Sequence, residues 1–291
     1  MVIIMNKILI TGDIHGKFNT IRELYSLYKD VYVNDNDTII LLGDFGANFF
    51  FNYQDYKFKK KLGTYNFNYF AIRGNHEQRP SICMAENPSE WHTEEFWGGR
   101  VYVENQFPYI KYAYDCPEVY YIPAEKSEPI KTLVLPGAYS VDKYYRLANN
   151  WSWFEYEQCN EQERLLGSEL AKTQSWDLIL SHTCPIFFEP TDSYKIKLDQ
   201  SMVDKTTERW LGQIEYNTKY NLWCWGHYHI NRIYPYSKEG NQLALFGDCF
   251  FDLYKYFCDN KKIENCFIVT DDHSHIDNLN TLYENKGELK C

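Results

Sequence analysis

Several short, apolar, β-branched runs in this chain end in polar motifs, most of which contain glycine. Runs of this length, bounded by turn residues, are typical of buried β-strands. They occupy residues 7–11, 38–42, 69–72, 132–135, 178–180 and 222–225. The segment 17–30 differs, because its apolar residues recur at helical spacing and predict a helix with one apolar face. A strand, a helix and another strand in succession predict an α/β fold.

Further helices and strands are predicted in the second half of the chain. Asn160 is expected to cap a helix, with Glu163 bonding back to it. A third helix is predicted over 203–216, where three apolar residues are expected to face inward: Trp210, Leu211 and Ile214. The Tyr-rich segment 98–122 has little helical periodicity, which predicts antiparallel hairpins, and 230–270 alternates like strands.

The 291 residues are 44% hydrophobic, which is enough to bury a substantial core. We find neither an internal repeat nor a low-complexity linker, so one domain over 1–270 is predicted. The remaining segment, 271–291, is polar and is expected to form a surface tail.

Charge and cysteine content exclude some classes of protein. The formal charge of −10 argues against a protein that binds nucleic acid through a broad basic face. Nine scattered cysteines without a CxxC pair predict free thiols in a reducing compartment. The chain has neither a signal peptide nor about 20 consecutive apolar residues, so we expect a cytoplasmic protein that does not enter the membrane.

Residue types that bind metals stand where the predicted strands end, which is where α/β sheets place their sites. They are Asp13 and His15 in GDIHG, Asp44 in GDFG, Asn75 and His76 in GNHE, His182 in SHTCP, and His227 and His229 in GHYH. In an extended D-x-H or H-x-H segment the two outer residues point the same way, so both can face one site. Imidazole, carboxylate and amide donors together favour manganese, iron or zinc over calcium.

The ordered set of five motifs resembles the calcineurin-like metallophosphoesterase superfamily over residues 8–248. The resemblance implies a four-layer α/β/β/α sandwich of two mixed β-sheets flanked by helices. It also implies a dinuclear metal site at the strand ends. The domain over 1–270 would then be a calcineurin-like metallophosphoesterase domain.

The resemblance further implies a role for each motif residue. Asp13, His15 and His229 would hold one divalent ion, Asn75, His182 and His227 the other, and Asp44 would bridge both. A hydroxide shared by the two ions would attack phosphorus in line, while His76 protonates the leaving oxygen.

Other residues near the motifs are assigned to binding or support. Arg73 is expected to clamp the substrate phosphate, with a structural salt bridge as the alternative. Asn75 is expected to contact the substrate as well as a metal ion. Glu77 is expected to orient a ligand by hydrogen bonding. The loop that contains Tyr139 and Asp142 is expected to shape the floor of the pocket.

The second motif departs from the serine/threonine phosphatase pattern. It reads GDFGANFFF and lacks the arginine of those enzymes, which argues against a general protein phosphatase. Phe49, Phe50 and Phe51 stand in that place. One hypothesis is that one of their rings stacks on a base or another flat leaving group, and the alternative is core packing or a hydrophobic lid.

The sequence therefore predicts a metal-dependent hydrolase of phosphate esters, acting as a phosphatase or a phosphodiesterase. The expected substrate is a phosphorylated small molecule, a nucleotide or a phosphoprotein, and no obligate protein partner is evident. One alternative is a nuclease, for which lysines 57 and 59–61 provide a local basic patch despite the acidic net charge. The other alternative is a catalytically inert scaffold that binds proteins.

Overall fold

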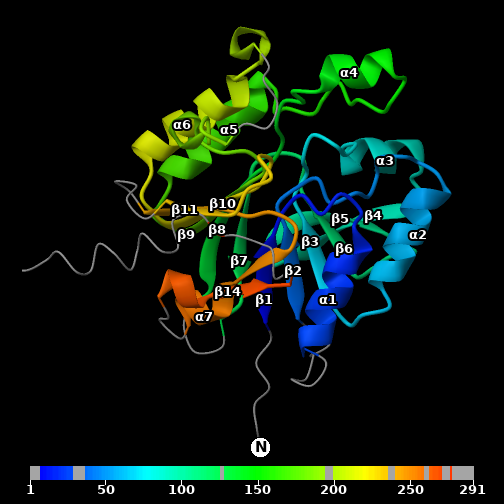
Figure 1. Ribbon diagram of the computed structural model, residues 1–291, viewed down its shortest axis with the longest axis horizontal. Coiled ribbons are helices and arrows are strands. Elements are labelled where there is room, and N and C mark those ends of the chain that lie inside the picture. Colours follow the sequence, from blue (N-terminus) through cyan, green and yellow to red (C-terminus); the bar gives the residue numbers. More distant parts are fainter. Residues whose placement is uncertain are drawn as a thin grey trace, which may run out of the picture.

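Two β-sheets pack face to face in the computed structural model, and helices cover the outer face of each sheet (Figure 1). The structure describes residues 7–28, 37–124, 128–193, 199–234, 240–258, 262–270 and 276. Each sheet mixes parallel and antiparallel strand pairs. The predicted sandwich of two mixed sheets flanked by helices is therefore confirmed.

The larger sheet has eight strands among the described residues. In spatial order they are β14 (Phe267–Val269), β13 (Cys249–Asp252), β1 (Ile8–Thr11), β2 (Thr38–Leu41), β3 (Asn68–Ala71), β6 (Ile110–Ala113), β5 (Gly99–Glu104) and β4 (Trp91–Phe96). The strands β1, β2, β3 and β6 run parallel, and the outer pairs are antiparallel. The carboxyl ends of β1, β2 and β3 therefore lie side by side at one edge of the sheet.

The smaller sheet has six strands in the described part of the chain. Their order is β11 (Arg232–Tyr234), β12 (Asn241–Ala244), β10 (Tyr220–Trp225), β9 (Trp176–Ser181), β8 (Ile130–Leu135) and β7 (Glu118–Ile122). The four inner strands are parallel, while β7 and β11 pair antiparallel at the two edges. The carboxyl ends of β9 and β10 are thus neighbours too.

On the outer face of the larger sheet lie α1 (Phe18–Tyr28), α2 (Tyr53–Leu62) and α3 (Pro80–Glu86), and on that of the smaller sheet lie α5 (Glu161–Lys172) and α6 (Thr206–Asn217) (Figure 1). The helix α7 (Leu253–Phe257) packs against the core between the sheets, and α4 (Lys143–Ala148) projects away from both sheets. None of the helices among the described residues has the length and apolar character needed to cross a bilayer.

Alternation of side chains along each strand produces three hydrophobic layers. In β1, Ile8 and Ile10 point into the core between the sheets, while Leu9 packs on the other face with Ile21 of α1. In β9, Leu180 likewise faces the core between the sheets, whereas its neighbours on the opposite face pack against the helix side. Every strand that carries a motif is therefore anchored on both faces, and its end is held firmly.

Most of the predicted strands and helices are confirmed, with small shifts of their boundaries. In the segment 230–270, where strands were predicted, the structure also has the helix α7 at Leu253–Phe257. Asn160 and Glu163 form the predicted capping box at the start of α5, with bonds of 3.0 and 2.8 Å. The helix predicted from residue 203 begins at Thr206, and its three predicted inward residues are buried. The helix α2 was not predicted, because its four lysines obscure its apolar face.

The antiparallel hairpins predicted over 98–122 are only partly correct. The strands β5 and β6 pair as expected, but β7 crosses to the smaller sheet and pairs with β8. The predicted tail lies outside the described residues except for Ile276, which is buried in the core between the sheets. The domain boundary at residue 270 stays a prediction.

Replacement of Asn160 by alanine should weaken the start of α5. The variant loses the side-chain acceptor for the Glu163 N–H, so we expect the free energy of unfolding to fall by about 1 kcal/mol. Urea unfolding measures this change. The control is Gln162→Ala, because Gln162 is exposed on the same helix turn. Equal stability of the two variants would contradict the role of the cap.

Candidate metal centre

The five motifs follow strands whose carboxyl ends meet at one edge of the sandwich. Asp13 and His15 follow β1, Asp44 follows β2, Asn75 and His76 follow β3, His182 follows β9, and His227 and His229 follow β10. The two sheets thus contribute to the same site from opposite sides. This is the position at which open α/β sheets bind their ligands.

The backbone of these motifs is not extended, contrary to the sequence argument. Asp13 and His15 have φ values of 53° and 45°, and His227 and His229 have 72° and 53°. Asp44, at 49°, adopts the same left-handed conformation. Non-glycine residues rarely adopt it, and clusters of such residues mark functional sites. The predicted convergence is correct, but tight turns produce it.

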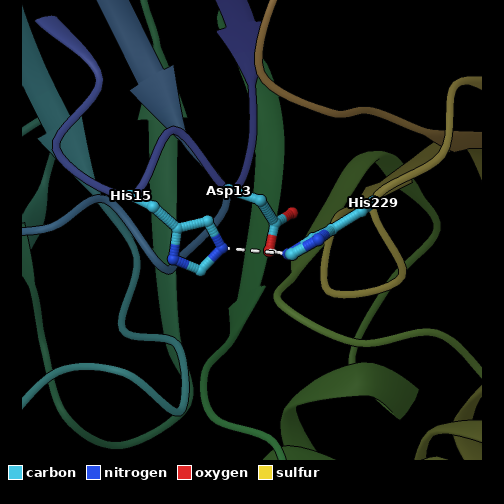
Figure 2. Close-up of side chains that lie close together, drawn as sticks. All are labelled: Asp13, His15 and His229. Carbon is cyan, nitrogen blue, oxygen red and sulfur yellow. Dashed lines mark hydrogen bonds and ion pairs between the residues drawn. The ribbon is translucent and has the colours of Figure 1, made fainter. Parts of the chain in front are cut away.

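The first cluster combines Asp13, His15 and His229, whose ligand atoms lie within 4.8 Å of one another. His15 Nε2 is 2.9 Å from His229 Nε2, and Asp13 Oδ1 is 3.7 Å from the same nitrogen. Figure 2 shows the Asp13 carboxylate pointing to the space between the two rings. These three residues are the set that the sequence assigned to one ion.

Asp44 lies at the centre of the site. Its Oδ1 is 3.4 Å from His182 Nε2, and its Oδ2 is 4.0 Å from His15 Nε2 and 3.8 Å from His76 Nε2. Asp44 forms one potential metal-binding group with His15 and His76, and another with Asp13 and His182. A single carboxylate therefore faces imidazoles from three different loops.

The residues assigned to the second ion also lie together. Asn75 Oδ1 is 2.9 Å from His182 Nε2, and the rings of His182 and His227 are 5.0 Å apart. The His182 Nδ1–H donates to the Leu42 carbonyl at 2.6 Å, so Nε2 presents a lone pair to the site. Carboxylate, amide and imidazole lone pairs thus converge on one space.

This convergence fits bound cations. Asp13 Oδ1 is buried and has no hydrogen-bond partner. Burial lowers the pKa of His15 to about 4, although Asp44 acts in the opposite direction, and burial also lowers the pKa of His182 and His227. Neutral imidazoles beside carboxylates are the protonation states that divalent ions require. The donor set suits two such ions.

The two buried carboxylates at the centre differ in their surroundings. Burial raises the pKa of Asp13 well above its usual value, and the charge of Asp44 adds to this effect. Burial would also raise the pKa of Asp44, but the neighbouring His76, His182 and His15 hold it well below its ordinary value. Asp44 therefore stays ionised at the position that faces the most imidazoles.

Glycines next to the ligand residues let the loops approach closely. A Cβ added to Gly74 would lie 2.2 Å from Asp44 Oδ1, and one added to Gly226 would lie 2.3 Å from Asp13 Oδ2. Any side chain at these two positions would displace a central carboxylate.

Glu77 joins two of the ligand-bearing loops. Its carboxylate accepts N–H bonds from Phe45 and from Gly74, the latter at 2.8 Å. These donors are the residue after Asp44 and the residue before Asn75. Burial raises the pKa of Glu77 to about 8, with a further contribution from Asp44. Glu77 thus holds ligand loops through their backbone, as an orienting residue would.

Ser140 was missed by the sequence analysis, although it orients Asn75. The Asn75 Nδ2 donates to Ser140 Oγ at 3.1 Å, and this leaves Asn75 Oδ1 facing His182. Ser140 is itself held by Glu157 and Arg146. The charged partners lie 6 and 17 residues further along the chain, so no local motif revealed them.

Arg73 is buried beneath the site, with its side chain only 1% exposed. Its guanidinium donates to the backbone carbonyls of Tyr156 and Glu157, and its Nε lies 3.9 Å from Asp115 Oδ1. It does not line the cavity beside the metal-binding groups. Nη1 makes both of the carbonyl bonds, whereas Nε and Nη2 are buried without a hydrogen-bond partner. The geometry favours the structural alternative over the phosphate clamp, because Arg73 does not reach the cavity.

A cavity of about 300 Å³ opens beside the clusters, and we call it the first cavity. Tyr139 and Asp142 line it, as expected for the pocket floor. Other lining residues were not predicted, most of them because they come from α6 and the segment before it, outside the motifs: Ser193, Gln200, Val203, Asp204, Lys205 and Glu208. Tyr228 also lines the cavity and was missed, although it lies within the GHYH motif.

Replacement of Glu77 by glutamine should weaken metal binding without unfolding the protein. The amide supplies only one acceptor, so one of the two bonded N–H groups faces an N–H donor. We expect zinc affinity to fall by about 10- to 100-fold in calorimetric titration. Glu86→Gln, an exposed site on α3, is the control. Unchanged affinity in Glu77→Gln would show that the bridge does not support the ligands.

Replacement of Arg73 by methionine should reduce stability. The variant leaves the buried Glu157 carbonyl without its side-chain donor, whereas the Tyr156 carbonyl keeps the Arg79 Nε–H at 2.8 Å, so we expect a loss of about 2 kcal/mol in urea unfolding. Arg209→Met, at an exposed position of α6, should be near neutral. Wild-type stability of Arg73→Met, together with a strongly raised KM for a phosphate ester, would instead support a phosphate clamp.

Comparison with known proteins identifies the family of this chain. The family model for calcineurin-like phosphoesterase matches residues 6–231. No curated protein sequence matches the chain. Solved structures similar to it include a dimetal phosphatase from Danio rerio, with 9% identity over 85% of this chain and 95% of that one and a TM-score of 0.46. Phosphopantetheinyl hydrolase from Mycobacterium tuberculosis has 10% identity over 94% and 99%, with a TM-score of 0.45.

A 5′-nucleotidase from Candida albicans has 13% identity over 97% of this chain and 58% of that one, with a TM-score of 0.41. The family match rests on the sequence and spans most of the chain, including the motifs from Asp13 to His229. The chain belongs to the calcineurin-like phosphoesterase family.

Proposed function

We propose that this protein hydrolyses phosphate esters, as a phosphatase or a phosphodiesterase, with two divalent ions at the centre described above. The observation that carries the proposal is the position of the Asp44 carboxylate. It lies 3.4 to 4.0 Å from three imidazole nitrogens that come from both sheets. A buried carboxylate in that position is suited to being shared between two metal sites.

The proposed ligand sets follow the observed clusters. Asp13, His15 and His229 would hold one ion, Asn75, His182 and His227 the other, and Asp44 would contact both. When bound, the two ions polarise the phosphoryl oxygens and lower the pKa of a water molecule near phosphorus. Manganese, iron and zinc all suit this mixture of imidazole, carboxylate and amide donors.

His76 is the proposed general acid. Its side chain is 25% exposed and lines the first cavity, whereas the His182 side chain is fully buried. The Asp44 Oδ2 lies 3.8 Å from His76 Nε2, so the imidazole stands beside the central carboxylate and at the cavity wall. From that position His76 would donate a proton to the leaving oxygen as the P–O bond breaks.

Asn75 is the proposed substrate contact as well as a ligand. Its amide nitrogen carries two hydrogens and donates one of them to Ser140. The second is the one that would reach a phosphoryl oxygen. Asn75 is buried and lines the first cavity, so its position is defined before substrate arrives.

The substrate proposed here is a phosphorylated small molecule, a nucleotide or a phosphoprotein. The basic patch that would support a nuclease is smaller than its sequence implied. Lys59 is buried and ion-paired with Glu104, while Lys57, Lys60 and Lys61 are exposed on α2. A catalytically inert scaffold would have no need to retain His76 beside Asp44.

The test is a panel of phosphate esters given to protein stripped of metal and reloaded with manganese, zinc, iron or magnesium. We expect hydrolysis by at least one metal form and none after chelation. His76→Ala should lower kcat by about 10²- to 10⁴-fold, because the leaving oxygen loses its acid. Asp44→Asn should also abolish hydrolysis, because both ions lose a ligand.

His92→Ala is the matched control, since His92 is exposed on β4 and bonds Asn105. Circular dichroism verifies that each variant is folded. Wild-type turnover by His76→Ala would reject His76 as the acid while leaving the metal centre intact. Inactivity of the wild type with every metal and every ester would reject the proposed function.

A further inference from the structure

A second cavity adjoins the metal centre on its other side. It measures about 340 Å³ and is lined by His15, Gly16, Gly46, Phe49, Phe50, Gln54, Phe58 and His76. His15 and His76 also line the first cavity. The two imidazoles therefore stand between two cavities, each near the lower end of the size range for ligand pockets.

The wall of the second cavity contains an aromatic corner formed by Phe49 and Phe50. The Phe49 ring is stacked beside His76, with centroids 5.8 Å apart and an angle of 30°. The Phe50 ring stands at 90° to Phe49, with centroids 4.7 Å apart. A flat ring placed in this corner would contact one face and one edge, which are the two favoured aromatic arrangements.

The corner is held in place by a buried carboxylate. Asp55 accepts N–H bonds from Phe49 and Phe50 at 3.1 Å and from Phe51 at 2.8 Å, and it is only 5% exposed. Three charge-assisted bonds from consecutive residues keep the rings oriented before any ligand binds. Phe50 nevertheless stays 50% exposed. Exposed apolar surface that the fold holds rigidly beside a site is typical of binding surfaces.

Polar groups complete the second cavity. Gln54 is exposed in the first turn of α2, and its side-chain amide can both donate and accept hydrogen bonds. An amide beside two aromatic rings can pair with the polar edge of a heteroaromatic ring while the phenyl rings cover its faces. An aliphatic ligand could bond to the amide but would not stack on the ring faces.

We infer that the substrate is a phosphodiester whose two organic arms extend into the two cavities, with a flat heteroaromatic ring in the aromatic corner. This inference rests on the proposed function, because the phosphate would lie at the metal centre between His15 and His76. Water adds to phosphorus, the P–O bond to one arm breaks, and the departing oxygen takes a proton. The products are a phosphate monoester and an alcohol.

A phosphate monoester would fill only one of the two cavities. It has one organic arm, so one of the two cavities beside the phosphate would hold only water. A diester places an organic group in each, and both cavities then contribute to binding. A monoesterase and a diesterase would therefore differ in the ratio of their turnover of matched monoesters and diesters.

The experiment compares three substrates on the metal-loaded enzyme: thymidine 5′-(methyl phosphate), the same diester of deoxyribose without the base, and the monoester thymidine 5′-phosphate. Chromatography follows the products. We expect kcat/KM for the thymidine diester to exceed that of the base-free diester by about tenfold or more. It should also exceed that of the monoester.

Two neighbouring variants make the test specific. Phe50→Ala should reduce the preference for the base-bearing diester to about unity, measured as a ratio within the same variant. Phe51→Ala is the control. Phe51 is 53% exposed and Phe50 is 50% exposed, but Phe51 lines a different cavity, together with Trp91 and Phe107. The control variant should retain the wild-type ratio. A wild-type ratio in Phe50→Ala would overturn the aromatic corner, and a monoester turned over as fast as the diester would overturn the two-armed substrate.

A binding measurement separates this inference from the proposed function. Thymidine has no phosphate, so saturation-transfer NMR with the zinc-loaded protein reports the corner alone. We expect saturation of the base protons in the wild type and in Phe51→Ala, and its loss in Phe50→Ala. If no ester is hydrolysed but this pattern holds, the proposed function fails and the corner stands. Equal signals in all three proteins would reject the corner.

Discussion

The structure depends on one buried carboxylate that residues from two sheets approach together. Asp44 stands at the end of β2, and His182 reaches it from the other sheet with a nitrogen–oxygen distance of 3.4 Å. Gly74 permits the closest backbone approach, since any added Cβ would meet the carboxylate. Such crowding of lone pairs is unfavourable without positive charge among them. The turns, glycines and hydrogen bonds around the site hold the Asp44 carboxylate and the neighbouring imidazoles together in the position where cations would neutralise them.

The sandwich provides that restraint through its layers. Strands that precede the ligand residues are covered on both faces, by the opposite sheet and by helices, so packing fixes the position of their ends. Strained left-handed turns at Asp13, Asp44 and His229 are tolerated there because the surrounding core defines them. Glu77 adds a bond between two of the turns. The packing of the core thus offsets the strain of the turns that hold the ligand residues.

Much of this arrangement was predictable from sequence, because strand composition and ligand-type residues are local signals. The runs that became β1, β2, β3, β9 and β10 carry their motifs immediately after them. Features that depend on distant segments were not predictable. The direction of the Arg73 guanidinium depends on carbonyls that lie 83 and 84 residues further along the chain. The position of β7 in the smaller sheet depends on its pairing with β8. Ser140 was missed because its partners are also non-local.

Anomalous diffraction from crystals of the manganese-loaded protein tests the central claim most directly. The account predicts two anomalous peaks about 3.5–4 Å apart, each within about 2.2 Å of the Asp44 carboxylate. One peak should lie among Asp13, His15 and His229, and the other among Asn75, His182 and His227. A single peak, or two peaks that do not share Asp44, would contradict the account.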